Sequence, residues 1–181
     1  MNITPTPLKD VFILEPVVLE DERGYFFESW NERTFSEIAD ARFVQDNQSG
    51  SVRGVLRGLH YQLPPAAQGK LVRVISGSVF DVAVDIRRSS PTFRHWFAQE
   101  LSSANRLQLW VPPGFAHGFL VLSNSAEIAY KTTGFYSRDH DRALAWDDPE
   151  IAIDWPTGID GPILSAKDQA APRLAVAEVF D

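Results

Sequence analysis

The sequence predicts an all-β fold, a sandwich or barrel for which a jelly roll is the leading architecture. Short runs rich in β-branched and aromatic residues recur along the chain, and Pro and Gly separate them. Eight or more such runs with turn residues between them are typical of antiparallel sandwiches and barrels. The expected strands are residues 24–30, 42–48, 71–76, 79–86, 93–101, 108–111, 117–122 and 127–135.

Alternation along two strands indicates which side chains share a face. Apolar residues in 80–86 alternate with Asp81 and Asp85, which we interpret as the solvated face of that strand. Lys70 shares its face with the valines two and four positions later. A lysine in that place either extends along the surface to reach water or points into a cavity.

A few short helices are expected beside the strands. Residues 31–39 are predicted to form one helix with Asn31 as its N-cap. Its apolar face comprises Phe35, Ile38 and Ala39. Ser165-Ala-Lys-Asp168 resembles a capping box with Asp in place of Glu, and it opens a helical turn that Pro172 ends. The proline-punctuated end of the chain is expected to wrap over the barrel.

Length, charge and composition narrow the class of protein. At 181 residues the chain is expected to form a single domain, 1–181, with a substantial core. The net charge of −7 argues against a nucleic-acid partner, because such proteins present a basic face. No apolar run reaches the ~18 residues of a membrane helix, and no secretory signal is recognisable. The absence of cysteine fits a reducing compartment, so we expect a cytoplasmic protein without a membrane partner.

The segment Arg57-Gly-Leu-His-Tyr-Gln62 is the most informative in the chain. It places a permanent cation and a titratable imidazole beside a glycine in a strand-like region. Histidine is the natural general base near neutrality. Arg57 and His60 would point to opposite faces of a regular strand, so they can converge only if the strand is irregular. A β-bulge at Gly58 would cost the least free energy.

Taken singly, each candidate residue also has a purely structural explanation. A histidine or tyrosine can be a hydrogen-bonded core residue, an aspartate can stabilise a helix start, and a lysine or arginine can be a solvated surface charge. These explanations apply to His60, His117, Tyr130, Asp168, Arg23, Lys70 and Lys167.

Metal binding is the main alternative chemistry for a small β-barrel that contains histidines. The four histidines, His60, His95, His117 and His140, include no His-x-His pair that would put two imidazoles on one strand face. A site built from His60, His117 and one carboxylate stays open as an alternative. The chain also lacks a phosphate-binding glycine loop and a nucleophile elbow. We therefore expect neither a metal nor another cofactor.

Several segments, in order along residues 8–172, resemble the dTDP-4-dehydrorhamnose 3,5-epimerase family. They are Asp21-Glu-Arg-Gly-Tyr-Phe-Phe-Glu-Ser29, Phe43-Val-Gln-Asp-Asn47, Arg57-Gly-Leu-His-Tyr-Gln62, Phe80-Asp-Val-Ala-Val-Asp-Ile-Arg87, Gln108-Leu-Trp-Val-Pro-Pro-Gly-Phe-Ala-His-Gly-Phe119, Tyr130-Lys131 and Leu164-Ser-Ala-Lys-Asp168. The resemblance implies a cupin-like jelly roll, a homodimer and no metal. The implied activity is epimerisation of dTDP-4-dehydro-6-deoxy-glucose at C3 and C5, in dTDP-L-rhamnose biosynthesis.

The resemblance also implies a role for each catalytic side chain. His60 would be the base, Asp168 would fix its tautomer, and Tyr130 would return a proton to the opposite face of the sugar. Lys70 would stabilise the enolate, with assistance from His117. Inversion needs groups on both faces, because one residue on one face would only exchange the proton. The open alternatives are an epimerase that inverts only C3 or only C5, and a non-catalytic nucleotide-sugar-binding barrel.

The implied substrate contacts are more widely spread. Tyr136 would stack on thymine, while Arg23, Arg57 and Lys167 suit the pyrophosphate because charge-assisted bonds to phosphate are strong. The full set is Arg23, Glu28, Gln45, Asp46, Asn47, Arg57, Lys70, His117, Tyr136, Asp141 and Lys167, with His140 as the alternative to Asp141. N-terminal strands of family members cross to the partner subunit, so some of these contacts are expected in trans.

Overall fold

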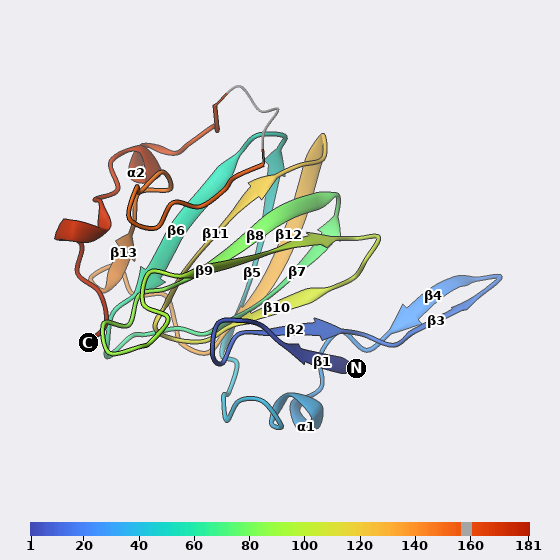
Figure 1. Ribbon diagram of the computed structural model, residues 1–181. Coiled ribbons are helices and arrows are strands. Elements are labelled where there is room, and N and C mark those ends of the chain that lie inside the picture. The colour runs from blue at the N-terminus through green and yellow to red at the C-terminus, as the bar shows by residue number, and fades with distance from the viewer. Residues whose placement is uncertain (157–160) are drawn as a thin grey trace.

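The computed structural model describes residues 1–156 and 161–181, and it consists mainly of two antiparallel β-sheets that face each other (Figure 1). The first sheet has the order β1 (Asn2–Pro5), β2 (Phe12–Glu15), β10 (Gln108–Val111), β7 (Lys70–Ser76), β12 (Ser125–Thr132), β5 (Gln45–Val52). The second has the order β13 (Asp141–Ala143), β6 (Leu56–Gln62), β11 (Phe115–Val121), β8 (Ser78–Asp85), β9 (Trp96–Ser102). This arrangement confirms the predicted all-β, cupin-like jelly-roll barrel.

A separate hairpin extends from the barrel. It is formed by β3 (Val18–Asp21) and β4 (Gly24–Phe27), which pair only with each other among the described strands. Figure 1 shows this hairpin projecting well beyond the two sheets. The expected strand 24–30 therefore exists only as far as Phe27, and it belongs to the hairpin instead of the barrel.

The other seven expected strands are confirmed, six with shifted ends and 108–111 with the bounds of β10, and the motif at 57–62 lies in β6. Strands β1, β2, β3 and β13 were not predicted. Each has four residues or fewer, which is too short for an alternating pattern to stand out.

The main core lies between the two sheets. Val72 and Ile128 of the first sheet pack there with Ala83 and Phe119 of the second. The outer face of β8 is covered as well, because Val82 and its neighbours pack beneath the C-terminal segment. Both faces of the strand are therefore buried.

The interpretation of Asp81 and Asp85 as a solvated strand face is wrong. Both residues lie on the face opposite Val82, as alternation predicted, but that face points into the barrel and both are fully buried. The opposite face of β8, which carries Val82 and Val84, is covered by residues that follow the strands in sequence. Alternation within one strand shows which side chains share a face but does not show which faces are covered.

The helices are short. Asn31 caps α1 (Glu32–Phe35) by accepting from the backbone N–H of Arg33, and Phe35 is buried, as expected. The predicted helix 31–39 was too long, because the chain after Phe35 continues only in isolated turns. Ser165 caps α2 (Ala166–Gln169), which confirms the predicted helical turn, and η1 (Leu174–Val176) is a 3₁₀ turn. No helix in the described ranges is long and apolar enough to cross a membrane.

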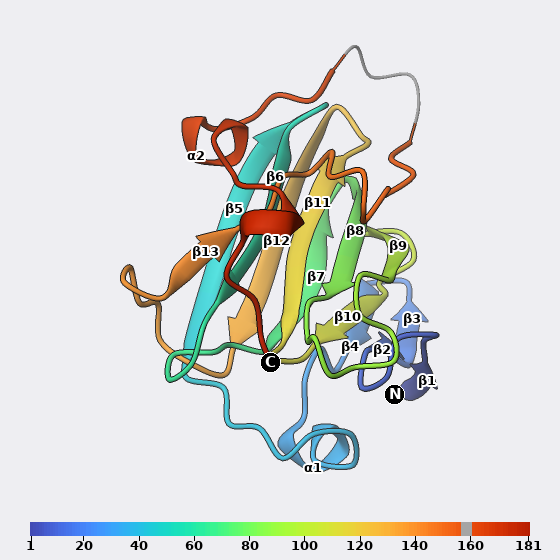
Figure 2. The same cartoon turned by 60° about the vertical axis from the view of Figure 1, so that its left-hand side comes forward.

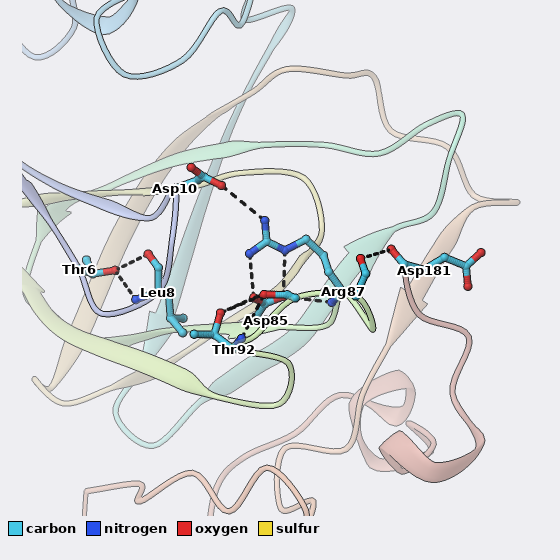
Figure 3. A network of polar contacts seen from close by, with 9 residues as sticks. Thr6, Leu8, Asp10, Asp85, Arg87, Thr92 and Asp181 are labelled. Atoms are coloured by element: carbon cyan, nitrogen blue, oxygen red, sulfur yellow. Dashed lines mark hydrogen bonds and ion pairs between the residues drawn. The ribbon is translucent and has the colours of Figure 1, made fainter.

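Polar contacts near the buried carboxylate of Asp85 tie the ends of the chain to the barrel (Figure 3). The Arg87 guanidinium donates to Asp85 at 2.7 and 2.9 Å and lies 3.5 Å from Asp10 in the N-terminal segment. Thr92 also donates to Asp85, and Ser89 donates to the main-chain carbonyl of Asp181. The paired guanidinium satisfies the carboxylate of Asp85, which would otherwise be costly to bury.

The C-terminal segment crosses the outer face of the second sheet (Figure 2). Leu144, Ile151 and Leu174 pack there against Leu59 of β6 and Val84 of β8. This packing confirms that the end of the chain wraps over the barrel. It also fixes α2 beside β6, which brings Asp168 to the mouth of the barrel.

Candidate active site

A cavity of about 190 Å³ opens between the two sheets, at the end where α2 approaches β6. Strands β5, β6, β7 and β12 contribute to its walls, together with the segment after β12 and α2. Its lining comprises Gln45, Asn47, His60, Tyr61, Gln62, Gln68, Lys70, Tyr130, Tyr136, Asp141 and Lys167. Residues from distant parts of the sequence therefore meet in one polar hollow.

His60 and Asp168 form a dyad at this cavity. Nε2 of His60 lies 2.5 Å from Oδ1 of Asp168, and the Asp168 side chain is almost fully buried. Oδ2 of Asp168 accepts from the hydroxyl of Ser165, whose oxygen also caps α2. An ionised Asp168 requires the proton on Nε2, which leaves Nδ1 as the basic nitrogen of the ring.

The electrostatics of this pair suit a base. Burial lowers the pKa of His60, and the hydrogen bond to Asp168 offsets this only in part, so the imidazole is neutral near pH 7. Burial acts to raise the pKa of Asp168, but hydrogen bonds from His60 and Ser165 outweigh it and lower that pKa. A neutral imidazole beside an ionised carboxylate can take up a proton and be stabilised as the imidazolium.

Lys70 points into the cavity, which settles the two alternatives for its position. It lies at the start of β7, and its Nζ donates to the main-chain carbonyl of His60 at 3.2 Å. Burial lowers its pKa to about 8, while the nearby carboxylates of Asp141 and Asp81 act to raise it. A desolvated cation of this kind is suited to stabilise an oxyanion.

Tyr130 lines the same cavity from β12, in the sheet that faces His60. Burial raises the pKa of its phenol, so the group is protonated at neutral pH and can act as an acid. Arg57 is near enough to lower that pKa in part. Nε of Arg57 donates to the hydroxyl of Ser51 at 3.0 Å.

The irregularity predicted at Gly58 is present. Pairing between β6 and β11 shifts register between His117 and Phe119, opposite this part of β6. Gly58 has a φ of +134°, and a Cβ there would lie 2.5 Å from Cα of Gly118. The shift lets His60 line the cavity while Arg57, three residues earlier, approaches Tyr130.

The rim of the cavity is held by a short polar chain. Asp141 accepts from the Tyr136 hydroxyl at 3.2 Å and from Nζ of Lys167 at 2.5 Å. Gln45 accepts from the backbone N–H of Tyr136 and donates to Asn47. Asp141 therefore lines the cavity, whereas His140 bonds to Ser137 and is not part of the lining.

Five of the predicted substrate-binding residues lie outside this cavity, and one of them is Arg57, which bonds to Ser51. Arg23 is at the hairpin tip, paired with Asp21, and Glu28 accepts from Asn31. Asp46 lies on the outer face of β5, paired with Lys131, because alternation allows Gln45 and Asn47 but not Asp46 to face inward. His117 is buried behind the cavity, where its Nε2 lies 2.9 Å from Oδ1 of Asp81.

Some lining residues were not predicted as site residues. Gln62 donates to the carbonyls of Ala66 and Phe135 and accepts from the N–H of Ser137, so it holds the segment that carries Tyr136. Its position at the end of the Arg57–Gln62 motif was the available signal. Gln68 had no such signal, and it lines the cavity from the loop that precedes β7.

The proposed alternative of a histidine metal site has no matching geometry in the part of the chain that the structure describes. No group of three or more His, Asp or Glu side chains there is placed to hold a metal ion. His60 and His117 each turn Nε2 toward a carboxylate of their own, Asp168 and Asp81.

A jelly-roll barrel with a His–Asp dyad, a lysine and a phenol around one cavity is suited to acid–base isomerisation. A model of the dTDP-4-dehydrorhamnose 3,5-epimerase family matches residues 5–176. The protein of that name from Shigella flexneri is 54% identical over 182 residues, which cover 99% of either chain. The one from Methanothermobacter thermautotrophicus is 52% identical over 166 residues, which cover 91% of this chain and 89% of the relative.

A solved structure of similar shape is dTDP-6-deoxy-D-glucose-3,5-epimerase from Legionella pneumophila, in complex with dTDP-4-keto-L-rhamnose. It matches with a TM-score of 0.94 at 49% identity, over 98% of this chain and 94% of that chain. A dTDP-4-dehydrorhamnose 3-epimerase from Streptomyces niveus is 38% identical over 179 residues, which cover 98% of this chain and 86% of the relative. The chain belongs to the dTDP-4-dehydrorhamnose 3,5-epimerase family.

Proposed function

We propose that this protein epimerises dTDP-4-dehydro-6-deoxy-α-D-glucose at C3 and C5 to dTDP-4-dehydro-β-L-rhamnose, in dTDP-L-rhamnose biosynthesis. One observation carries the proposal. His60 and Tyr130 line the same cavity from facing sheets, and Asp168 orients the imidazole. Family membership and the identity of 54% to a relative of that activity agree with it.

Each inversion needs one proton removed and another returned. Nδ1 of His60 takes the proton at the carbon beside the C4 ketone, and the electron pair moves into an enolate whose negative charge rests on O4. Lys70 stabilises that oxyanion, for which a donor in a dry site contributes roughly 3 kcal/mol. The hydroxyl of Tyr130 then gives its proton to the opposite face of the carbon. Exchange with water restores both groups, so the net reaction is isomerisation.

The nucleotide is proposed to occupy the rim of the cavity. Tyr136 is exposed there and offers a flat ring for thymine. Lys167 on the cavity wall and Arg57, which lies near Tyr130, are the cations proposed for the pyrophosphate. Asn47, Gln45 and Asp141 supply further polar contacts to the sugar or base. A phosphate ligand at Lys167 would compete with its bond to Asp141.

We further propose that the protein is a homodimer. The hairpin that projects from the barrel exposes Leu19 by 63%, Tyr25 by 62% and Phe26 by 70%, and contiguous exposed apolar surface marks interaction sites. Arg23 and Glu28 lie on or beside this hairpin, away from the cavity of their own chain. Seating the hairpin against a second copy would let both residues reach the partner's substrate. The cytoplasmic location stays a prediction.

Conversion in D₂O tests the proposed reaction. The protein is incubated with dTDP-4-dehydro-6-deoxy-glucose, and the product is examined by NMR. We expect two carbon-bound deuterons, at C3 and C5, and an L-configured sugar. A single deuteron would show an enzyme that inverts one centre only.

The His60→Ala variant separates catalysis from binding. We expect it to lose kcat by roughly 10²–10⁴-fold while dTDP binding, measured by calorimetry, is largely kept. Unchanged kcat would support a non-catalytic use of the same cavity. Activity that persists in a chelator, with no bound metal by elemental analysis, would remove the metal-dependent alternative.

A further inference from the structure

A second buried His–Asp pair lies directly behind the dyad, and the proposed reaction leaves it unused. Nε2 of His117 lies 2.9 and 3.0 Å from the two carboxylate oxygens of Asp81. Asp81 is fully buried and His117 nearly so, and neither lines the cavity. A carboxylate so deeply buried is expensive unless a charge or several donors compensate for it.

Strand register places this pair close to Lys70. His117 of β11 is the direct partner of His60 on β6, and Nζ of Lys70 donates to the main-chain carbonyl of His60. Asp81 lies diagonally across from His117, on the neighbouring strand β8, with its side chain on the same interior face. Asp81 therefore approaches Lys70 through His117 and His60, and no hydrogen bond or ion pair joins Asp81 to Lys70 within the described residues.

Several charged groups around Lys70 affect its pKa. Asp141 and Asp81 act to raise its pKa, and Lys167 acts to lower it, against the larger lowering that burial causes. Asp141 lies at the rim and already binds Lys167 and Tyr136, whereas within residues 1–156 and 161–181 the one hydrogen-bond partner of the Asp81 side chain is His117. The charged groups that act on the pKa of Lys70 are Asp141, Asp81 and Lys167. The titratable groups that line the cavity with Lys70 are His60, Tyr61, Tyr130, Tyr136, Asp141 and Lys167.

We propose that Asp81 is a positioning residue that keeps Lys70 protonated in the resting enzyme, with His117 holding its carboxylate in place. The inference rests on the proposed function, since it concerns the cation that stabilises the enolate. Substrate binding at the rim engages Asp141 and Lys167, so their influence on the pKa of Lys70 changes during turnover. Asp81 is out of reach of the substrate and supplies a constant counter-charge.

Direct titration of Lys70 tests this role. The chain has four lysines, Lys9, Lys70, Lys131 and Lys167, so ε-¹³C-lysine labelling gives four signals, and Lys70→Met assigns the relevant one. We expect Asp81→Asn, which keeps an acceptor for His117, to lower the titration midpoint of Lys70 by roughly one pH unit. The alkaline limb of kcat/KM should move down by the same amount.

A matched control lies on the same strand. Asp85 is equally buried on the same face of β8, but its partner is Arg87. Asp85→Asn should leave the Lys70 midpoint where it is in the wild type, whatever it does to stability. Asp81→Ser is the second neutral variant and should shift the midpoint in the same direction as Asp81→Asn.

The possible results separate the two proposals. An unchanged Lys70 midpoint and an unchanged pH profile in a folded, neutral Asp81 variant overturn the inference, even where kcat falls. If neither neutral variant folds while Asp85→Asn does, Asp81 serves folding and the inference fails. A wild-type protein that does not convert the sugar nucleotide would refute the proposed function, whereas the titration would still show whether Asp81 controls the charge on Lys70.

Discussion

The imidazole of His60 and the carboxylate of Asp168 lie 2.5 Å apart, although 108 residues separate them in the sequence. One belongs to the barrel and the other to a four-residue helix laid over its mouth. Asp168 receives hydrogen bonds from His60 and Ser165, so its orientation does not depend on the substrate. Such a dyad fixes both the tautomer and the direction of the ring.

We expect Asp168→Asn to reduce kcat by roughly 10²–10⁴-fold, because an amide can stabilise the wrong tautomer and cannot stabilise the imidazolium. KM and dTDP affinity should change little. Steady-state kinetics and calorimetry provide the comparison. Ser165→Ala is the matched control: it removes one bond to Asp168 and should lose far less kcat. Equal losses in the two variants would mean that the helix cap, and not the carboxylate, is what matters.

The pH profile of kcat/KM should be bell-shaped. His60 acts as a base only when neutral, and its lowered pKa puts the acid limb below the ordinary value of 6.5. Lys70 stabilises the enolate only when protonated, and its pKa of about 8 sets the alkaline limb. Activity is therefore expected to rise with pH through the first value and to fall through the second. Lys70→Arg should move the alkaline limb upward, and an unmoved limb would assign it to another group.

Tyr130→Phe should uncouple proton exchange from inversion. His60 can still remove and return a proton on its own face, so solvent deuterium should enter unconverted substrate. Product formation should fall far more than this exchange, because the opposite face has lost its donor. Time-resolved NMR in D₂O follows both rates in one sample. Parallel loss of exchange and product would argue against the assignment of Tyr130 to the second face.

Gly58→Ala should destabilise the protein by at least about 2 kcal/mol. The new Cβ would lie 2.5 Å from Cα of Gly118, and the φ of +134° is unfavourable for alanine. Urea unfolding gives the change in free energy. Gly50→Ala on β5 is the control, because nothing lies within 4 Å of its Cβ, and a change of no more than ~0.5 kcal/mol is expected. Similar values for both variants would contradict this account of Gly58.

Phe26→Asp should weaken the proposed dimer, because Phe26 is the most exposed apolar residue of the hairpin. Sedimentation velocity across a concentration series measures the change. Val176→Asp is the control, since Val176 is similarly exposed but lies in η1 on the opposite part of the molecule. Arg23→Ala should raise KM without changing the mass. A monomeric wild-type protein with full activity would contradict the homodimer.

Sequence patterns predicted the longer strands and the class of fold, because each of those strands carries its alternation within itself. They failed where burial depends on remote residues. Asp81 lies on a face that looks polar in its own strand, yet the other sheet covers it from inside the barrel. The cap at Asn31 was visible in the sequence, whereas the early end of α1 after Phe35 was not.

In the candidate site, too, some residues could be predicted from the sequence and others could not. His60, Lys70 and Tyr130 were predicted, and the structure gathers all three around one hollow. Family resemblance assigned the consecutive residues Gln45, Asp46 and Asn47 to the substrate, but a strand cannot turn three successive side chains to one side. Nothing in the local pattern marked Gln68, which reaches the hollow only because the chain loops back before β7.

The arrival of Asp168 from beyond the last strand has a consequence for biosynthesis of the protein. All strands in the described ranges precede α2 in the sequence, so they are synthesised before α2 is available to meet His60. A nascent barrel at that stage holds its histidine without an orienting carboxylate. An oriented imidazole therefore requires the segment that follows the last strand, in addition to the barrel itself.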